Sequence, residues 1–268
     1  VAFSLTLLTR TMVFPAFLAA VAALFFERRW KQGILIGAVM ALFLTPYFWR
    51  NYHIDGSIVP PRSGWNLLQG NCPYSEKTIP KYNPDLLDAY VSKVLQEERP
   101  DLLTDEGLDV AKKTDRFYTA KALEFMRTHP WKTLRLKIKN VFYLFHPHIV
   151  PFNSMGKNTR ITLVGEEDVK VEGIPERGIF VEVAHSLSYT VIFIGAVCGM
   201  IFRRKFWKQD LILYLIIFNF TAVYAVYWPA TRLRAPMDFI LMFYAAVAFS
   251  RILARYFSFP CKPNPYQA

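Results

Sequence analysis

Long apolar runs separated by short polar stretches dominate both ends of the chain. Five runs are long enough, or nearly so, to cross about 30 Å of hydrocarbon as helices. They cover approximately residues 11–26, 33–49, 185–202, 210–228 and 236–254. Because the first residue is Val and residues 1–8 are apolar, the chain is interpreted as a fragment that begins at the end of an earlier helix. The pattern predicts an all-α polytopic membrane protein with about five transmembrane helices and an N-terminal helix stub.

The central residues show helical rather than membrane-spanning patterns. A helix is expected near 84–97, and another at 105–128, where Thr104 is suited to cap its start. The stretch 131–147 carries an apolar stripe, with its lysines and arginines mainly off that stripe. This is the pattern of a helix lying in the membrane interface. The alternative is a packed helix whose basic face is solvated.

The remaining central segments are less regular. Residues 55–73 are rich in Gly and Pro and are expected to be irregular chain. Short alternating runs between 160 and 183 favour small strands. We therefore expect three parts: N-terminal transmembrane helices at 1–49, a mainly α domain with minor β structure at 50–184, and C-terminal transmembrane helices with a tail at 185–268.

The distribution of charge predicts how the chain is oriented. Residues 50–182 hold 19 basic and 18 acidic side chains, whereas the rest of the chain holds 13 and 3. The excess therefore flanks apolar runs, at 27–31, 203–208 and the C-terminal tail, which argues against nucleic acid as the partner. The positive-inside rule makes these three clusters cytoplasmic. The expected location is a plasma membrane, or bacterial inner membrane, with 50–184 extracytoplasmic and the C-terminus cytoplasmic.

Familiar cofactor and metal signatures do not occur in the sequence. There is no GxGxxG or P-loop pattern, so a nucleotide-linked donor has no support. The three cysteines lie far apart, and His146 and His148 around Pro147 are weak grounds for a metal. No cofactor and no metal ligand are expected, and metal dependence stays open.

Four arginines are expected beside the spans on the side opposite the basic clusters: Arg10, Arg50, Arg232 and Arg234. Each of them suits a structural role, with its side chain reaching the lipid phosphates of the outer leaflet. Arg232 and Arg234 suggest a second role, because they share a predicted turn before Pro236. A guanidinium grips phosphate through two hydrogen bonds, so this pair is a candidate clamp for a lipid-linked phosphate.

Two further charged positions bear on the same end of the spans. Asp238 is the only acidic residue well inside a predicted span and follows Arg234 by four positions. It is interpreted as a structural partner of that arginine, with a substrate contact as the alternative. A break in the chain at 8–11 places Arg10 near a surface, because a lone arginine at mid-bilayer is costly.

The order of these features resembles the C-terminal half of membrane-integral glycosyltransferases of the C superfamily, the family 39 or protein-mannosyltransferase-like proteins. The matching pieces are "LLTRT" (7–11), "LTPYFWRNYHIDGSIVPPRSGWNLLQGNCP" (44–73), the stretch 114–147 and "TRLRAPMDFILMFYAA" (231–246). The resemblance covers nearly the whole chain. Two positions depart from the family pattern: Leu233 replaces an aromatic residue and Thr11 replaces a proline.

The resemblance implies inverting transfer of a sugar from a polyprenyl-phosphate donor to an unknown acceptor on the outer face. It implies that Arg232, Arg234 and Arg10 bind the donor phosphate and that the general base lies upstream of Val1. The catalytic residues therefore stay unassigned. Four further residues are expected to contact substrate or to pair structurally: Asp238, Arg50, Asn66 and Asn71.

Two alternatives stay open at the level of sequence. A polysaccharide ligase or polymerase with a lipid-diphosphate donor also uses outer-face arginines and a large outer loop. A transporter or non-catalytic membrane scaffold is the other alternative. The spans at 33–49 and 210–228 lack internal charges, which weighs against an ion-coupled transport path.

Overall fold

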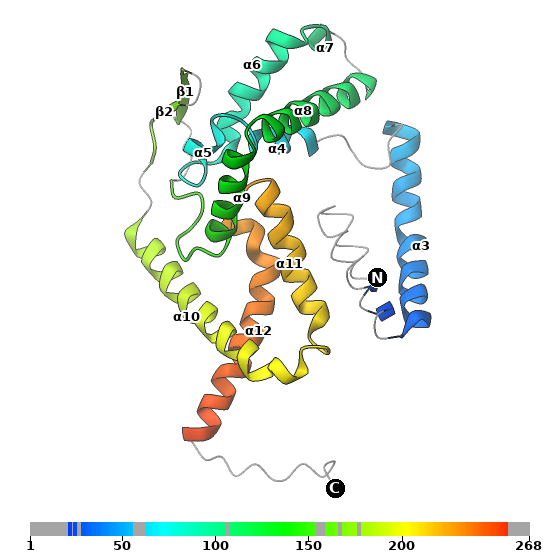
Figure 1. Cartoon of the computed structure of the whole chain (residues 1–268), viewed down its shortest axis with the longest axis vertical. Coiled ribbons are helices and arrows are strands. Elements are labelled where there is room, and N and C mark those ends of the chain that lie inside the picture. Colours follow the sequence, from blue (N-terminus) through cyan, green and yellow to red (C-terminus); the bar gives the residue numbers. More distant parts are fainter. Residues whose placement is uncertain are drawn as a thin grey trace.

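The computed structural model describes residues 21–22, 24–25, 28–55, 63–104, 108–153, 159–165, 168–175 and 178–256. Within these ranges the chain is largely helical, with one two-stranded hairpin. The most apolar helices occupy one end of the molecule, and helices of more mixed composition gather at the other (Figure 1). The prediction of a mainly α protein with minor β structure is therefore confirmed for the described residues.

Three long helices have the length and apolarity needed to cross a membrane: α3 (Trp30–Asp55), α10 (Ile179–Arg203) and α12 (Thr231–Tyr256). A fourth apolar helix, α11 (Leu211–Val226), has 16 residues. At 1.5 Å per residue it is about 24 Å long, shorter than the hydrocarbon layer. These helices contain three of the five predicted runs in full and most of the run at 210–228, and the run at 11–26 lies mostly outside the described residues.

A second group of elements forms a separate layer. They are α4 (Ser63–Gln69), α5 (Ser75–Thr78), η2 (Pro84–Leu87), α6 (Asp88–Glu98), α7 (Asp101–Thr104), α8 (Leu108–Thr128) and the antiparallel strands β1 (Arg160–Val164) and β2 (Asp168–Glu172). We call this layer the cap. Its core is a cluster of buried apolar side chains that includes Leu68, Leu87, Val91, Tyr118 and Ala122.

The structure agrees with the two helices predicted first in the central region and corrects two other expectations. The helix expected at 84–97 is η2 followed by α6, and the one expected at 105–128 is α8. The segment 55–73 is not wholly irregular, because it contains α4. Gly64 of α4 is a packing residue, since a Cβ there would lie 2.2 Å from the carbonyl oxygen of Asp115 in α8. The last alternating run, at 178–183, forms the start of α10 rather than a strand.

Helices α10 and α12 pack closely along a small-residue face of α10. Gly195 and Gly199 stand four positions apart, the spacing that lets two membrane helices approach at backbone distance. A Cβ on Gly199 would lie 1.9 Å from the carbonyl oxygen of Tyr244, and one on Gly195 would lie 3.1 Å from the Cβ of Ala245. No side chain fits at position 199 unless the two helices move apart.

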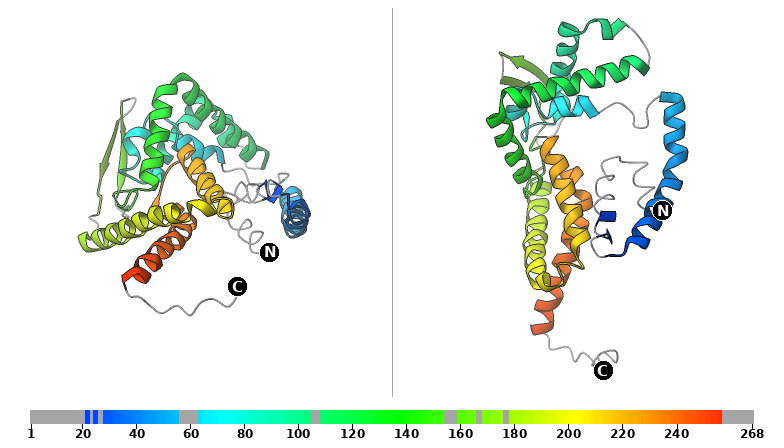
Figure 2. Two further views of the ribbon diagram at one scale, coloured as in Figure 1. Left: turned by 60° about the horizontal axis from the view of Figure 1, so that its bottom comes forward. Right: turned by 45° about the vertical axis from the view of Figure 1, so that its right-hand side comes forward.

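Helix α9 (Pro130–Leu144) connects the cap to the long helices. It descends from α8 and packs against α11 (Figures 1 and 2). Leu136 and Leu144 are buried on one face, whereas Trp131 and Phe142 of the predicted apolar stripe are 80% and 71% exposed. The helix therefore has two apolar faces, one packed within the protein and one uncovered. A position in the membrane interface stays a prediction for the uncovered face.

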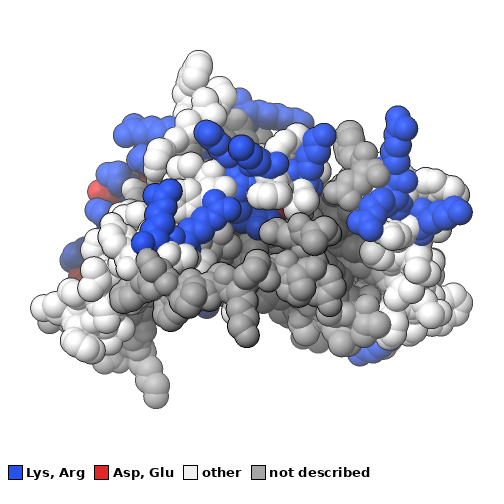
Figure 3. Space-filling model, turned by 90° about the horizontal axis from the view of Figure 1, so that it is seen from below, with Lys and Arg blue, Asp and Glu red and all other residues white. Residues whose placement is uncertain are grey.

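Basic side chains gather at the end opposite the cap. The start of α3, the connection η3 (Arg204–Phe206) between α10 and α11, and the end of α12 all lie at this end (Figure 1). Seen from this end, the surface shows many lysines and arginines and few acidic residues (Figure 3). The exposed basic residues of these three segments are Arg28, Arg29, Lys31, Arg204, Lys205, Lys208, Arg251 and Arg255.

Candidate functional site at the start of helix α12

The start of α12 is fastened to the loop that follows α9. The backbone nitrogen of Thr231 donates to the carbonyl oxygen of Val150 at 2.9 Å, and the backbone nitrogen of Val150 donates to Thr231 Oγ1 at 2.8 Å. Beside this double contact lies a cavity of about 400 Å³. It is lined by Asn83, Ile149, Val150, Pro151, Trp228, Ala230, Thr231 and Arg232. We call it the arginine pocket.

Arg232 gives this pocket its charge. The side chain is exposed, and its guanidinium carbon lies 5.8 Å from the centre of the Trp228 ring. None of the described lining residues is acidic. The first backbone N–H groups of α12 add the partial positive charge of a helix N-terminus. The pocket therefore combines an accessible guanidinium with apolar walls, which suits an anionic group attached to an apolar chain.

Arg234 has different surroundings, although it is only two residues further on. It is 1% exposed, and its Nη1 donates to the carbonyl oxygens of Leu144 at 3.2 Å and His146 at 3.0 Å. Its guanidinium carbon lies 3.5 Å from the centre of the Tyr189 ring, and its Nε forms an ion pair with Asp238 Oδ1 at 3.0 Å. Arg234 thus joins the end of α9 to α10 and α12.

The predicted turn before Pro236 is wrong, because α12 already begins at Thr231. Both arginines are therefore helical, and positions two residues apart point about 200° from each other around a helix. Arg232 faces the arginine pocket and Arg234 faces the interior. The structure does not bring the two guanidinium groups together at one surface.

The other predicted charged residues are spread over the molecule. Asp238 pairs with Arg234 at the four-residue spacing seen in the sequence. Arg50 is exposed near the end of α3, where its Nη1 donates to Asn51 Oδ1 at 3.3 Å. Arg10 lies outside the described residues. Binding of the donor phosphate by Arg10 and a substrate contact of Arg50 therefore stay predictions.

The two predicted asparagines lie in α4 and directly after it. Asn71 is fully buried, and its Nδ2 donates to the carbonyl oxygens of Leu67 at 2.8 Å and Val226 at 3.0 Å. Asn66 is half-buried, and its backbone oxygen accepts from the nitrogen of Gly70 at 3.1 Å. Asn71 therefore connects the cap to the last residue of α11.

Two residues of α9 complete this connection. Lys137 Nζ donates to the carbonyl oxygen of Val226 at 2.6 Å and also to Asn71 Oδ1, while Asn140 Nδ2 donates to the carbonyl oxygen of Ala225 at 3.0 Å. These side chains satisfy carbonyl groups that a helix end leaves unpaired. Burial lowers the pKa of the Lys137 ammonium to about 8, because its two partners are neutral oxygens.

The sequence did not predict that Lys137 and Asn140 bind the end of α11, although the position of Asn140 could have indicated a buried hydrogen bond. Asn140 lies on the same helical face as Leu136 and Leu144, and a buried amide among apolar residues usually has a hydrogen-bond partner. Trp228 follows Val226 by two positions, so the connection fixes the chain just before the arginine pocket.

A second hollow of about 400 Å³ lies on the other side of the loop, against the start of α10. Its lining is mainly apolar and includes Pro147, Ile179, Val183 and Leu187. His148 Nδ1 and Glu182 Oε1 lie 3.0 Å apart in its wall. We call it the apolar groove.

Comparison of the chain with protein-family models, with curated proteins and with solved structures returned no match. Across the part of the chain that the structure describes, no group of three or more His, Cys, Asp or Glu side chains could hold a metal ion. The fold and the site define a helical protein with three candidate membrane-spanning helices and a cap next to an arginine-bearing pocket.

Proposed function

We propose that this protein is a multi-pass membrane glycosyltransferase that uses a polyprenyl-phosphate sugar donor. The observation that carries the proposal is the accessible guanidinium of Arg232 in a pocket without acidic lining, beside the start of a candidate membrane helix. A lipid-linked phosphate presents the same combination, with an anion at the membrane surface and an apolar chain below it. The resemblance of the sequence to membrane-integral glycosyltransferases supports the same class of reaction.

In the proposed reaction, an oxygen of the acceptor attacks the anomeric carbon of the sugar. The bond between that carbon and the phosphate oxygen breaks, and the lipid phosphate leaves with the electron pair. A base removes the acceptor's proton, and we assign no described residue to this task. Arg232 interacts with the charge that grows on the leaving phosphate, so it stabilises the transition state as well as the bound donor.

The surroundings of Arg232 supply the other parts of a donor site. Pro147 and His148 line the apolar groove, and the three residues that follow, 149–151, line the arginine pocket. We propose that the phosphate binds beside Arg232 and that the prenyl chain follows the apolar groove along α10. Arg234 positions the start of α12 without touching the donor. Arg10 remains a predicted second phosphate ligand.

The proposed topology places the cap outside the cell and the C-terminus in the cytoplasm. It is supported by the basic residues at the end of the long helices opposite the cap (Figure 3). A plasma membrane, or bacterial inner membrane, is the proposed location. Cysteine labelling of the cap and of the C-terminal tail in intact cells tests this arrangement, and labelling of both from the same side contradicts it.

The function is tested by assaying sugar transfer with the complete protein in lipid nanodiscs. Arg232→Ala is expected to lower transfer from a polyprenyl-monophosphate sugar about 10- to 100-fold, because the donor phosphate loses a charge-assisted contact. Arg204→Ala, which removes an exposed arginine at the end of the molecule opposite the cap, is the matched control and should retain wild-type transfer.

The choice of donor separates the proposal from its nearest alternative. Transfer with the monophosphate donor supports the proposal, whereas transfer with the diphosphate donor alone identifies a lipid-diphosphate-dependent ligase or polymerase. If neither donor supports transfer by the wild-type protein, the glycosyltransferase proposal is wrong and a transporter or scaffold role is favoured.

A further inference from the structure

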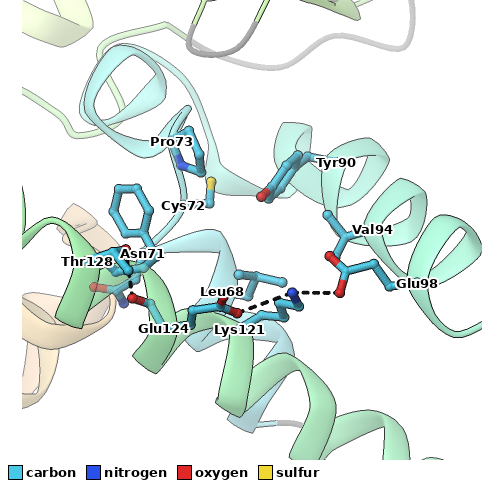
Figure 4. Close-up of a pocket in the computed structure, with 11 residues that line it drawn as sticks. Leu68, Asn71, Cys72, Pro73, Tyr90, Val94, Glu98, Lys121, Glu124 and Thr128 are labelled. Atoms are coloured by element: carbon cyan, nitrogen blue, oxygen red, sulfur yellow. Dashed lines mark hydrogen bonds and ion pairs between the residues drawn. The ribbon is translucent and has the colours of Figure 1, made fainter.

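The cap contains a pocket that is separate from the arginine pocket. It has a volume of about 210 Å³ and lies among α4, α6 and α8 (Figure 4). Its lining comes from three segments of the chain: Leu68, Asn71, Cys72, Pro73, Tyr90, Val94, Glu98, Lys121, Glu124, Phe125 and Thr128. Its size suits one small ligand, of the order of a single sugar ring.

A three-membered charge network forms one wall of this cap pocket. Lys121 Nζ lies 2.6 Å from Glu98 Oε2 of α6 and 3.2 Å from Glu124 Oε2 one turn further along α8 (Figure 4). The side chains of Glu98 and Glu124 are 45% and 62% exposed, so their carboxylates remain accessible to a ligand. Two carboxylates against one ammonium give the wall a net negative charge.

Apart from Asn71 and Thr128, the rest of the lining consists of aromatic and aliphatic side chains and one cysteine. Tyr90 and Phe125 supply rings, and Leu68 and Val94 supply aliphatic surface. The Cys72 thiol is buried, and burial raises its pKa to about 11, so it is not a thiolate near neutral pH. The pocket therefore offers hydrogen-bonding charges on one side and apolar rings on the other, without a nucleophile.

This combination fits a neutral polyhydroxyl ligand. Hydroxyl groups of a sugar donate to carboxylates and accept from an ammonium, while the C–H face of the sugar ring packs on aromatic rings. The negative wall disfavours a phosphate, which distinguishes this pocket from the arginine pocket. A peptide segment is a less suitable occupant, because the volume of the pocket is small.

We propose that the cap pocket binds one neutral monosaccharide unit on the acceptor side of the reaction. This role rests on the proposed glycosyltransferase function, since it assigns the acceptor's sugar to the cap and the donor's phosphate to the membrane edge. The two pockets share a structural connection through Asn71, which lines the cap pocket and donates to Val226 at the end of α11. Trp228 of the arginine pocket follows two residues later.

The test is saturation-transfer NMR on the complete protein in lipid nanodiscs that contain no sugar detergent. The probes are the methyl glycosides of mannose, glucose, galactose and N-acetylglucosamine, each at millimolar concentration. At least one of them is expected to receive saturation from the wild-type protein. Glu98→Gln and Glu124→Gln should each weaken its binding about tenfold, the loss expected for one charge-assisted hydrogen bond.

Glu97→Gln is the matched control. Glu97 lies on the same helix as Glu98, pairs with Lys93 at 3.7 Å on the surface and does not line the pocket, so its replacement should leave glycoside binding unchanged. Absence of saturation for all four glycosides overturns the proposal, and so does binding that survives both pocket substitutions. Arg232→Ala should leave glycoside binding intact, so a failure of the donor site and a failure of the cap pocket give different results.

Discussion

Arg232 and Arg234 are two arginines in the first turn of one helix, and they occupy two very different regions. Arg232 is exposed beside Trp228, in a pocket without acidic lining. Arg234 is 1% exposed, faces Asp238 and Tyr189, and binds two carbonyl oxygens at the end of α9. The same side chain thus serves an open pocket at one position and an internal junction at the other.

The difference follows from the helical repeat. A separation of two residues turns the side chain by about 200°, so one arginine faces outward when the other faces the protein interior. A buried guanidinium must have partners that replace water, and Arg234 has them in α9, α10 and α12. The guanidinium of Arg232, by contrast, is exposed and accessible to an anion. Substitution of Arg234 is therefore expected to reduce mainly the stability of the fold, and substitution of Arg232 mainly the binding of an anion.

The largest loss of stability is expected when Arg234, which joins α9, α10 and α12, is replaced. Arg234→Ala leaves Asp238 without its ion-pair partner and leaves the carbonyl oxygens of Leu144 and His146 without their donor. Removing one member of such a buried pair destabilises the fold by about 3–5 kcal/mol. The measurement is unfolding of the protein in nanodiscs.

A double-mutant cycle separates the ion pair from the other contacts of Arg234. Adding Asp238→Asn to Arg234→Ala should recover part of the lost stability, because the unpaired carboxylate is then absent. Arg234→Ala with wild-type stability would contradict the role of Arg234 as a junction.

The close contact between α10 and α12 should give the next largest effect. Gly199→Ala places a Cβ 1.9 Å from the backbone oxygen of Tyr244, which a flexible side chain cannot relieve, so a loss of about 1–3 kcal/mol is expected. Gly37→Ala is the matched control, since a Cβ there has nothing within 4 Å. The control should be neutral or slightly stabilising, because alanine favours helix over glycine. Equal effects of the two substitutions would show that close packing does not hold these helices together.

Lys137 should give a smaller, pH-dependent effect. Its pKa is lowered to about 8 in the folded protein from an ordinary value near 10.5. Between these values the unfolded chain binds more protons, so stability should rise with pH as the buried ammonium loses its proton. The gain from pH 8 to 10, relative to Lys137→Met, is expected to be about 2 kcal/mol. A difference between the two proteins that does not change with pH would contradict the lowered pKa.

Features set by local sequence were predictable, and those set by distant contacts were not. The helix near 84–97 and the one ending at Thr128 were found from their local sequence patterns, but the expected cap of the second helix was wrong, because Thr104 is the last residue of α7. Helix α4 was missed because its glycine suggests a loop, whereas Gly64 in fact provides room for α8.

The candidate site shows the same division. The sequence placed Arg232 beside a span and spaced Arg234 to pair with Asp238. The sequence could not show that Arg234 is buried, because its burial depends on a contact with Leu144 at the end of α9, which is 90 positions away in the sequence. Lys137 was likewise assigned to a basic face, and only the position of α11 gives it partners.

The most direct test of the account measures binding of a polyprenyl phosphate to the complete protein in nanodiscs, together with the stability of each variant. Arg232→Ala is expected to weaken binding at least about tenfold, while its stability changes by less than about 0.5 kcal/mol. Arg232→Lys should restore part of the binding, because it keeps the charge but loses the planar fork. Unchanged affinity in Arg232→Ala, at unchanged stability, would contradict the central claim that the arginine pocket holds the donor phosphate.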